Sequence, residues 1–257
     1  MIRVVRQEHG VAWVTVDRPQ ARNAMTFAMW ERLREAALEL DADPQVRVVI
    51  FTGAGSEAFV AGTDIAEFRA FTGADDGVAY ERRIDAALSA LDAIRVPTIA
   101  ALAGACTGGG VSIASTCDLR LGAANVRIGI PIARTLGNIV SLRNVARVAD
   151  LIGIDAAKAL LITGRLIGAD DALRAGFLTE IVADADTLVV RAQEQAEHIA
   201  ALAPLTVRAA KEIARRLRAA QSLPDGEDLV RQCYGSHDFR EGLTAFLDKR
   251  RPNWTGT

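Results

Sequence analysis

The sequence predicts an α/β core followed by a helical C-terminal subdomain. Segments typical of strands and of helices alternate as far as about residue 130, and the pattern after Pro131 is mostly helical. The 257 residues are enough for one large domain, or for one domain with a small appendage. We therefore expect a core over residues 1–195 and a helical subdomain over residues 196–257.

The expected strands are short and rich in β-branched or other apolar residues. The first two enclose a turn at His9-Gly10 and form a hairpin. In chain order, the expected strands are residues 2–6, residues 11–16, the segments VRVVIFTG and PTIAALAG, and residues near 118–122 and 126–130.

The expected helices fill the intervals between these strands. Thr26 is the expected N-cap of an amphipathic helix that runs to about Leu40. A glycine-rich loop, GAGSEAFVAGTD, separates the next strand from helices that reach about Ile94. A short helix follows three glycines, and the chain ends in the helical segment DFREGLTAFLDKRRPNW.

Composition and charge exclude several classes of protein. With 50% hydrophobic and 24% charged residues the chain is globular, and its net charge of -2 does not suggest a nucleic-acid binder, which usually carries a basic face. The local basic clusters KEIARRLR and DKRRP are typical of solvated helix faces or, as the alternative, of a docking site for an anionic ligand. No apolar run reaches the ~18 residues of a membrane-spanning helix, and the strand-like N-terminus does not resemble a signal peptide. Three scattered cysteines suit neither a disulfide framework nor a zinc site. We expect a cytoplasmic protein with no nucleic-acid or membrane partner.

Three consecutive glycines, Gly108, Gly109 and Gly110, stand at the start of the short helix. Glycine is the poorest ordinary helix former, so their presence needs a reason. Their spacing fits neither a P-loop nor a dinucleotide fingerprint. Close packing of the helix on a strand is one explanation. An anion site at the helix N-terminus, where glycine lets a ligand approach free N–H groups, is the other.

An oxyanion hole of this kind normally takes its second N–H from another segment. The segment AFVAGTDI, residues 58–65, is the candidate, because its glycine comes just before a helix start on a loop that leaves a buried strand. The chain therefore offers two glycine loops that are expected to meet.

The pair AFVAGTDI and AGACTGGGVSIASTCD resembles the paired oxyanion motifs of the crotonase superfamily, the enoyl-CoA hydratase/isomerase family. DRPQARNAM, VRVVIFTG and REGLTAFLDKRRPNW resemble the family's early CoA-binding loop, the following strand and the C-terminal helix, so the resemblance covers nearly the whole chain. It implies a crotonase-like spiral of ββα units with a C-terminal α-helical subdomain. It also implies a homotrimer or a dimer of trimers, with the subdomain over residues 196–257 serving oligomerisation and CoA contact.

The resemblance implies that the backbone N–H groups of Thr63 and Gly109 hold the carbonyl oxygen of an acyl-CoA thioester. Two fixed donors bind the oxyanion of an enolate more strongly than the ground-state carbonyl, which is what catalysis requires. CoA enters as part of the substrate, and no separate cofactor or metal is expected. The implied CoA contacts are Gln20, Ala21, Arg22, Ala61, Asp64, Ile65, Phe246 and Lys249.

Purely structural roles remain open for several of these residues. Thr63 is a possible N-cap of the helix that follows it, Phe246 a possible core residue of the C-terminal subdomain, and Lys249 part of a solvated basic helix end. His9, His198 and His237 stand in polar surroundings and are expected to be exposed rather than catalytic.

The chain departs from the family at the two positions that activate and deliver water. The hydratases use two glutamates there, and this chain has Ser112 and Ile132. Isoleucine cannot transfer a proton, and an unassisted serine is a poor acid or base near pH 7. Neither two-glutamate hydration nor the usual carboxylate-dependent isomerisation is therefore expected.

The helix on which the family's dehalogenases carry an aspartate has no carboxylate at the corresponding places. It offers Arg134, Thr135, Asn138 and Ser141. Arg134 is a candidate for binding a substrate carboxylate, or else a surface arginine. Asn138 is a candidate helix cap, and Ser112 a small helix residue that bonds its own backbone.

Three kinds of protein fit this combination of an intact oxyanion motif and absent glutamates. One is an enzyme that uses other groups, as in decarboxylation or retro-aldol cleavage, where departure of the leaving group creates the enolate. Another is a thioester hydrolase. The third is a non-catalytic acyl-CoA-binding subunit.

Overall fold

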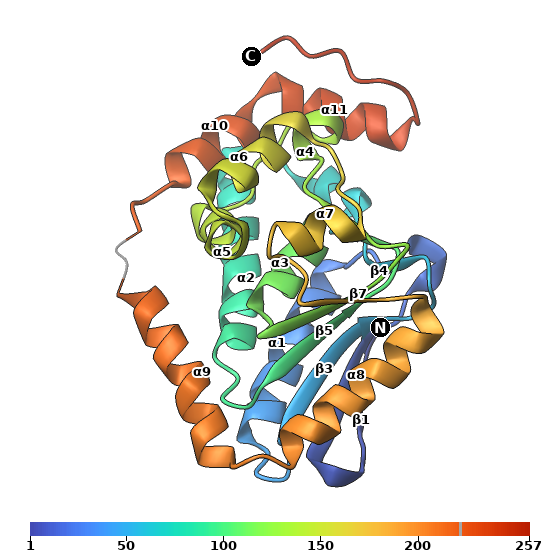
Figure 1. The fold of residues 1–257 in the computed structure, drawn as a ribbon. Helices are drawn as coiled ribbons and strands as arrows, with labels where there is room; N and C mark the ends of the chain where they lie inside the picture. The colour runs from blue at the N-terminus through green and yellow to red at the C-terminus, as the bar shows by residue number, and fades with distance from the viewer. Residues whose placement is uncertain (221–222) are drawn as a thin grey trace.

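A six-stranded sheet forms the centre of the molecule (Figure 1). The computed structural model describes residues 1–220 and 223–257. In spatial order the strands are β1 (Ile2–Arg6), β2 (Val11–Val16), β3 (Val48–Gly53), β5 (Thr98–Leu102), β7 (Leu119–Ala123) and β9 (Glu180–Val182). The first pair is antiparallel, with Val4 opposite Val14, and each later pair is parallel.

A second, three-stranded parallel sheet lies beside the first. Its strands are β4 (Ala58–Val60), β6 (Ala105–Thr107) and β8 (Arg127–Gly129). Each of them follows a strand of the large sheet and precedes a helix, so the chain repeats a strand–strand–helix unit. The repeat leaves the loops after β4 and β6 next to each other, because these two strands are paired.

Helices cover both faces of the large sheet. The largest core cluster contains residues of α1 (Phe27–Ala42), α2 (Ala74–Asp92) and α3 (Gly109–Thr116), whose apolar sides pack toward one face. On the other face lies α8 (Ala185–Ala200), which buries Leu188, Ala192, Ala196 and Ala200 against β2, β3, β5 and β7. This α8 helix crosses the sheet in Figure 1.

The remaining helices form two groups, one directly after β8 and one at the C-terminal end of the chain. Following β8, the chain forms α4 (Ile132–Thr135), α5 (Leu142–Ile152), α6 (Ile154–Thr163) and α7 (Ala169–Arg174). The C-terminal helices are α9 (Pro204–Ala219), α10 (Glu227–Gly235) and α11 (His237–Leu247). Helix α10 packs on α2, and α11 packs on the 3₁₀ turn η3 (Ile65–Ala70), whereas α9 extends away from them (Figure 1). Two further 3₁₀ turns are η1 (Glu8–Gly10) and η2 (Pro19–Ala21).

Most of the expected elements are confirmed. The N-terminal hairpin has the predicted bounds, and Thr26 caps α1 by accepting a hydrogen bond from the backbone N–H of Met29 at 3.2 Å. Two expectations need correction. Residues 58–60 form β4 inside the segment expected to be a loop, and β9 is a strand within the part expected to be mostly helical.

The expected division between residues 195 and 196 falls inside α8, which packs on the sheet through Ala200. The helical segment that leaves the core begins at α9. Among the described residues, no helix has both the length and the apolar character that crossing a membrane requires.

Candidate active site

Two glycine loops lie against each other at the ends of β4 and β6. Gly62 has φ +107° and Gly108 has φ +52°, a backbone region that favours glycine. A Cβ atom on Gly108 would lie 3.7 Å from the Cα of Gly62, and one on Gly62 would lie 3.6 Å from the carbonyl oxygen of Thr107. The two segments that the sequence predicts to meet are therefore in contact.

Thr63 and Gly109 follow these glycines, and each keeps a free N–H. Within the described part of the chain, no acceptor takes the backbone N–H of either residue. The Thr63 loop is held on both sides of that N–H, because Met25 N–H donates to Gly62 O and Asp64 N–H donates to Met25 O, both at 2.8 Å. Gly109 is the first residue of α3, where an N–H has no partner inside the helix.

The glycines of α3 also have a packing role. A Cβ atom on Gly110 would meet Val60 O at 2.2 Å, and one on Gly109 would meet Trp30 Cζ2 at 2.6 Å. The close-packing explanation thus holds for both residues. It does not compete with an anion site, since the same absence of side chains keeps the helix N-terminus accessible.

The side chain of Thr63 is fixed by two aromatic residues that sequence reasoning missed. Its Oγ1 accepts a hydrogen bond from Trp30 Nε1 at 3.0 Å and is hydrogen-bonded to the Tyr80 hydroxyl at 2.7 Å. The N-cap role considered for Thr63 is wrong. Asp64 is the cap of η3, because its side chain accepts from the N–H of Ala66.

The expected CoA-contact segments near the N-terminus are brought together. Arg22 O accepts a hydrogen bond from Ala61 N–H at 3.1 Å, which joins the Gln20–Ala21–Arg22 turn to the loop that leads to Asp64 and Ile65. Gln20 and Arg22 are exposed, and Ala21 is half-buried. Arg18 links the same loops, since its Nη1 lies 2.7 Å from Asp64 Oδ2.

Asn23, which the sequence did not single out, connects these loops from inside. Its side chain is fully buried. Its Nδ2 donates to Ala54 O at 3.0 Å and to Ala58 O at 2.7 Å, and its Oδ1 accepts from Arg18 N–H at 3.0 Å. One amide side chain thus satisfies three backbone groups of two loops.

The positions that depart from the family carry no acid or base. Ser112 is buried in α3, and its hydroxyl lies 3.5 Å from Gly108 O, in line with a small helix residue that bonds its own backbone. Ile132 is half-buried at the start of α4. Arg134 is exposed on α4, in agreement with the surface interpretation.

The C-terminal candidates are exposed. Phe246 is 49% exposed, so its interpretation as subdomain core is wrong for this chain. Lys249 is exposed just beyond α11 and has φ +55°. Both lie near the end of a helix that packs on η3, directly after the Thr63 loop. The three histidines are exposed as predicted.

A buried carboxylate that the sequence analysis missed lies behind the Thr63 loop. Glu81 on α2 is 4% exposed. Its Oε2 accepts from Ser141 N–H at 2.7 Å, and its Oε1 accepts from the Tyr234 hydroxyl at 2.9 Å. Burial raises the pKa of Glu81 to about 8 against the opposing effect of these hydrogen bonds.

Asn138 is the third member of this group. It is 9% exposed, and its Nδ2 donates to the Tyr234 hydroxyl at 2.9 Å. The helix-capping role considered for Asn138 is therefore wrong. Ser141 is the N-cap of α5, and its hydroxyl also donates to Asp85 at 2.8 Å.

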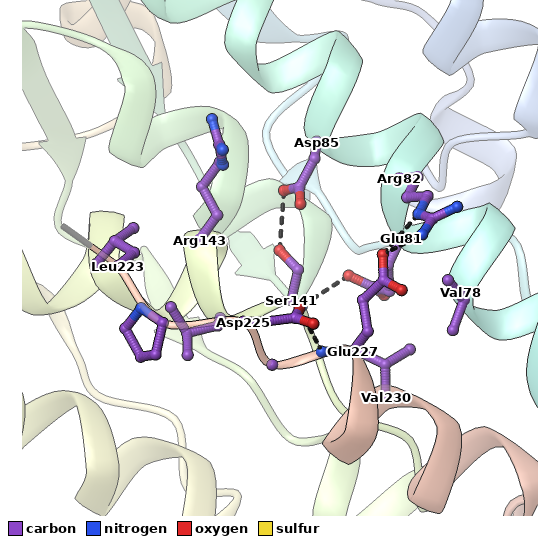
Figure 2. A pocket seen from close by; sticks show the side chains of 13 residues that line it. Val78, Glu81, Arg82, Asp85, Ser141, Arg143, Leu223, Asp225, Glu227 and Val230 are labelled. Atoms are coloured by element: carbon purple, nitrogen blue, oxygen red, sulfur yellow. Dashed lines mark hydrogen bonds and ion pairs between the residues drawn. The ribbon is translucent and has the colours of Figure 1, made fainter. Parts of the chain in front are cut away.

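Glu81 and Asp85 line a cavity of about 360 Å³. Figure 2 shows Ser141 between these two carboxylates, with a dashed line to each. The walls come from α2, the start of α5, residues 223–226 and α10. Among the described residues, no group of histidine, cysteine, aspartate and glutamate side chains is arranged to hold a metal ion.

Known proteins resemble the chain along its whole length. A family model described as enoyl-CoA hydratase/isomerase matches residues 6–257. A probable enoyl-CoA hydratase of Mycobacterium tuberculosis is 35% identical over 98% of this chain and 97% of its own length. The short-chain-enoyl-CoA hydratase of Clostridium acetobutylicum is 32% identical over 96% of this chain and 95% of its own length.

A solved structure of a methylmalonyl-CoA decarboxylase in complex with 2-nitronate-propionyl-CoA has the same fold. It superposes with a TM-score of 0.89 at 27% identity, over 100% of this chain and 98% of that chain. The spiral of strand–strand–helix units and the C-terminal helices described above therefore match a known architecture.

Proposed function

Because the chain belongs to the enoyl-CoA hydratase/isomerase family, we propose that it binds an acyl-CoA thioester and stabilises its enolate through the backbone N–H groups of Thr63 and Gly109. The observation that carries this proposal is the pair of unsatisfied N–H groups on two touching loops. Preorganised donors of this kind stabilise most strongly a negative charge that develops in the transition state.

The absence of acids at Ser112 and Ile132 argues against water addition by the two-glutamate route. Reactions that create the enolate by loss of a group need less proton transfer. Decarboxylation is the version that the methylmalonyl-CoA decarboxylase fold match favours. The bond from Cα to the carboxylate breaks, CO₂ leaves, and the electron pair passes into the thioester carbonyl until Cα takes a proton from water. Retro-aldol cleavage and thioester hydrolysis are the other enzymatic alternatives, and a non-catalytic binding subunit is the remaining one.

Binding is expected to require the CoA moiety. The proposed CoA-contact segments, Gln20–Arg22 and Ala61–Ile65, are joined by the hydrogen bond from Ala61 N–H to Arg22 O, and Thr63 with its free N–H lies within the second of them. A free acid would engage that N–H without the proposed CoA contacts. Isothermal titration calorimetry with acetyl-CoA, crotonyl-CoA and crotonate should show binding of both thioesters and none of crotonate. Equal binding of all three, or binding of none, would contradict the proposed function.

We also propose that the chain forms a trimer or a pair of trimers. Helix α9 has no buried residue in the single chain, and all sixteen of its residues are described. Leu205, Ile213 and Leu217 on it are 80%, 60% and 69% exposed. It is attached through Lys211, whose Nζ lies 2.7 Å from Asp118 Oδ2 and 2.9 Å from Val96 O, and through Arg218, whose Nε lies 2.9 Å from Asp150 Oδ2. Exposed apolar side chains of this size favour burial against another subunit.

Sedimentation at micromolar concentration should therefore show an oligomer, and Ile213→Glu with Leu217→Glu should shift it toward monomer. Leu217→Glu alone should shift the chain in the same direction, and Ala219→Glu is its matched control, because it adds the same single charge two residues further on, about 200° around the helix. A wild-type chain that sediments as a stable monomer would contradict the assembly. The cytoplasmic setting stays a prediction, with the thiols of Cys106, Cys117 and Cys233 free in the structure.

A further inference from the structure

Three polar protons meet at the side chain of Thr63, and the group uses only two of them internally. The Trp30 indole N–H, the Thr63 hydroxyl and the Tyr80 hydroxyl each carry one proton. Trp30 Nε1 donates to Thr63 Oγ1 at 3.0 Å, and one of the two hydroxyls donates to the other across 2.7 Å. Neither hydroxyl has any other acceptor among the described residues, so one hydroxyl proton is left over.

The surroundings of Tyr80 assign the leftover proton to Thr63. The Tyr80 ring packs against other aromatic rings, with the centroids of Phe27 and Phe68 at 5.5 Å and 4.9 Å. A phenol proton turned toward such surroundings would lose its hydrogen bond, so Tyr80 donates to Thr63. A phenol is also a stronger donor and a weaker acceptor than an aliphatic hydroxyl. Thr63 Oγ1 therefore accepts two hydrogen bonds and still has its own proton to donate.

The Thr63 hydroxyl lies at the proposed oxyanion hole. Three bonds separate Oγ1 from the backbone nitrogen of the same residue, which sets the distance between them at about 2.8–3.7 Å. Trp30 relates the hydroxyl to the second loop, because its ring atom Cζ2, two bonds from Nε1, would lie 2.6 Å from a Cβ atom on Gly109. One edge of the indole thus lies beside both residues that are proposed to hold the oxyanion. Thr63 is only half-buried, so a ligand at its N–H can reach the hydroxyl.

We propose that Thr63 is a specificity residue that recognises a 2-carboxyacyl thioester, with the thioester oxygen at its N–H and the carboxylate on Cα at its hydroxyl. The two acceptor oxygens of such a ligand can point to the same side, which gives them a spacing like that of the two donors. The inference deepens the function proposed above and rests on it. Trp30 and Tyr80 are positioning residues, because they act through the Thr63 hydroxyl.

A neutral donor suits a carboxylate that is to leave as CO₂. The departing group must pass its charge to Cα, and an ion pair with the carboxylate would stabilise the ground state more than the transition state. Arg18 lies beside this loop, but its guanidinium pairs with Asp64 at 2.7 Å. A hydroxyl orients the carboxylate without neutralising it, and a hydrogen bond to a charged acceptor is stronger than one to a neutral acceptor. The hydroxyl can therefore select a charged acyl group.

Two thioesters of similar shape test the inference. Sulfoacetyl-CoA has a sulfonate in place of the carboxylate of malonyl-CoA, so it cannot lose CO₂, and 3,3-dimethylbutyryl-CoA has a tert-butyl group there. The ratio of their dissociation constants, measured by calorimetry, gives the preference for the sulfonate. We expect Thr63→Val to lower this preference about 10-fold, because a hydrogen bond to a charged group is lost, and Thr63→Ser to retain it. Thr187→Val is the matched control, since Thr187 is exposed on α8, across the sheet.

Two further variants separate the Thr63 hydroxyl from its neighbours. Thr63→Val leaves the fully buried Trp30 without an acceptor for its indole N–H. Thr63→Val with Trp30→Phe removes both polar partners and should show the same low preference, whereas a restored preference would attribute the loss to the orphaned indole and overturn the inference. Tyr80→Phe keeps the Thr63 hydroxyl and should lose only part of the preference. A loss as large as in Thr63→Val would place the donor on Tyr80 and overturn the assignment to Thr63.

An equal loss of affinity for both thioesters in Thr63→Val would mean that the hydroxyl serves the thioester oxygen, and would overturn the inference. A wild-type protein that binds acetyl-CoA but shows no preference for the sulfonate would overturn it as well, and the proposed function would stand. If the wild-type protein binds neither acetyl-CoA nor these two thioesters, the proposed function fails and the inference fails with it.

Discussion

The Gly109→Ala variant is expected to lose about 100-fold of its affinity for 2-nitronate-propionyl-CoA and little of its affinity for propionyl-CoA. The nitronate is a planar anion conjugated with the thioester, so it reports on stabilisation of an enolate-like charge. A Cβ atom at residue 109 would meet Trp30 at 2.6 Å from Cζ2 and 3.1 Å from Cη2. Trp30 is fully buried, so the start of α3 must shift and carry its N–H away from the oxyanion.

Gly73→Ala is the matched control for this variant. Nothing lies within 4 Å of a Cβ atom at residue 73, so the same chemical change is made without a clash. The double variant Gly109→Ala with Trp30→Phe removes the colliding ring atoms but also the hydrogen bond from Trp30 Nε1 to Thr63 Oγ1, so it should regain only part of the preference for the nitronate. Equal affinities of wild type and Gly109→Ala for the nitronate would show that Gly109 does not hold the oxyanion.

Crotonyl-CoA hydration by the wild-type protein is expected to be at least about 10³-fold slower than by two-glutamate members of the family. General acid–base assistance contributes about 10²–10⁴-fold per group, and neither Ser112 nor Ile132 can supply it. The measurement is the loss of the absorbance of the conjugated thioester. A wild-type turnover near that of an ordinary hydratase would mean that other residues provide the acid and base.

Restoring the acids with Ser112→Glu and Ile132→Glu should raise the hydration rate if the oxyanion hole is formed. The gain will be limited, because Ser112 is 2% exposed and a larger carboxyl there is desolvated, which shifts its pKa upward. Ser112→Gln with Ile132→Gln is the control of equal size without acids. A rate increase in the glutamine variant as large as in the glutamate variant would attribute the gain to shape rather than to proton transfer.

The parts of the fold that sequence predicts best are those with a local cause. The hairpin Ile2–Val16 follows from its two β-branched runs, and the start of α1 follows from the cap at Thr26. Strands β4 and β9 have three residues each, and they exist because β6 and β7 pair with them. Such a short segment has no periodicity of its own, so only its distant partner makes it a strand.

The features of the candidate site also differ in how well the sequence predicts them. The glycines and their loops could be identified because their spacing is a local signal, whereas the contacts of Thr63 with Trp30 and Tyr80 join segments far apart in the chain. Glu81 carried a usable signal. It lies at helical spacing with the buried Val78, Ile84 and Leu88, so a carboxylate stands on the core side of α2. The adjacent Arg82 and Arg83 are exposed, and two charged neighbours make the single buried carboxylate hard to recognise in the sequence.

Helix α9 is attached through the polar contacts of Lys211 and Arg218 and has no buried side chain, and this arrangement affects how the protein folds. Burial of its apolar side chains contributes little to the stability of an isolated chain, since only Val207 among the larger ones is partly buried, and a helix of this length is marginal in water on its own. In the proposed trimer, its structure would then depend on a neighbouring subunit that covers it. Dilution should dissociate the proposed oligomer and unfold this helix. The helical content measured by circular dichroism should therefore decrease as the protein is diluted, while the rest of the fold persists.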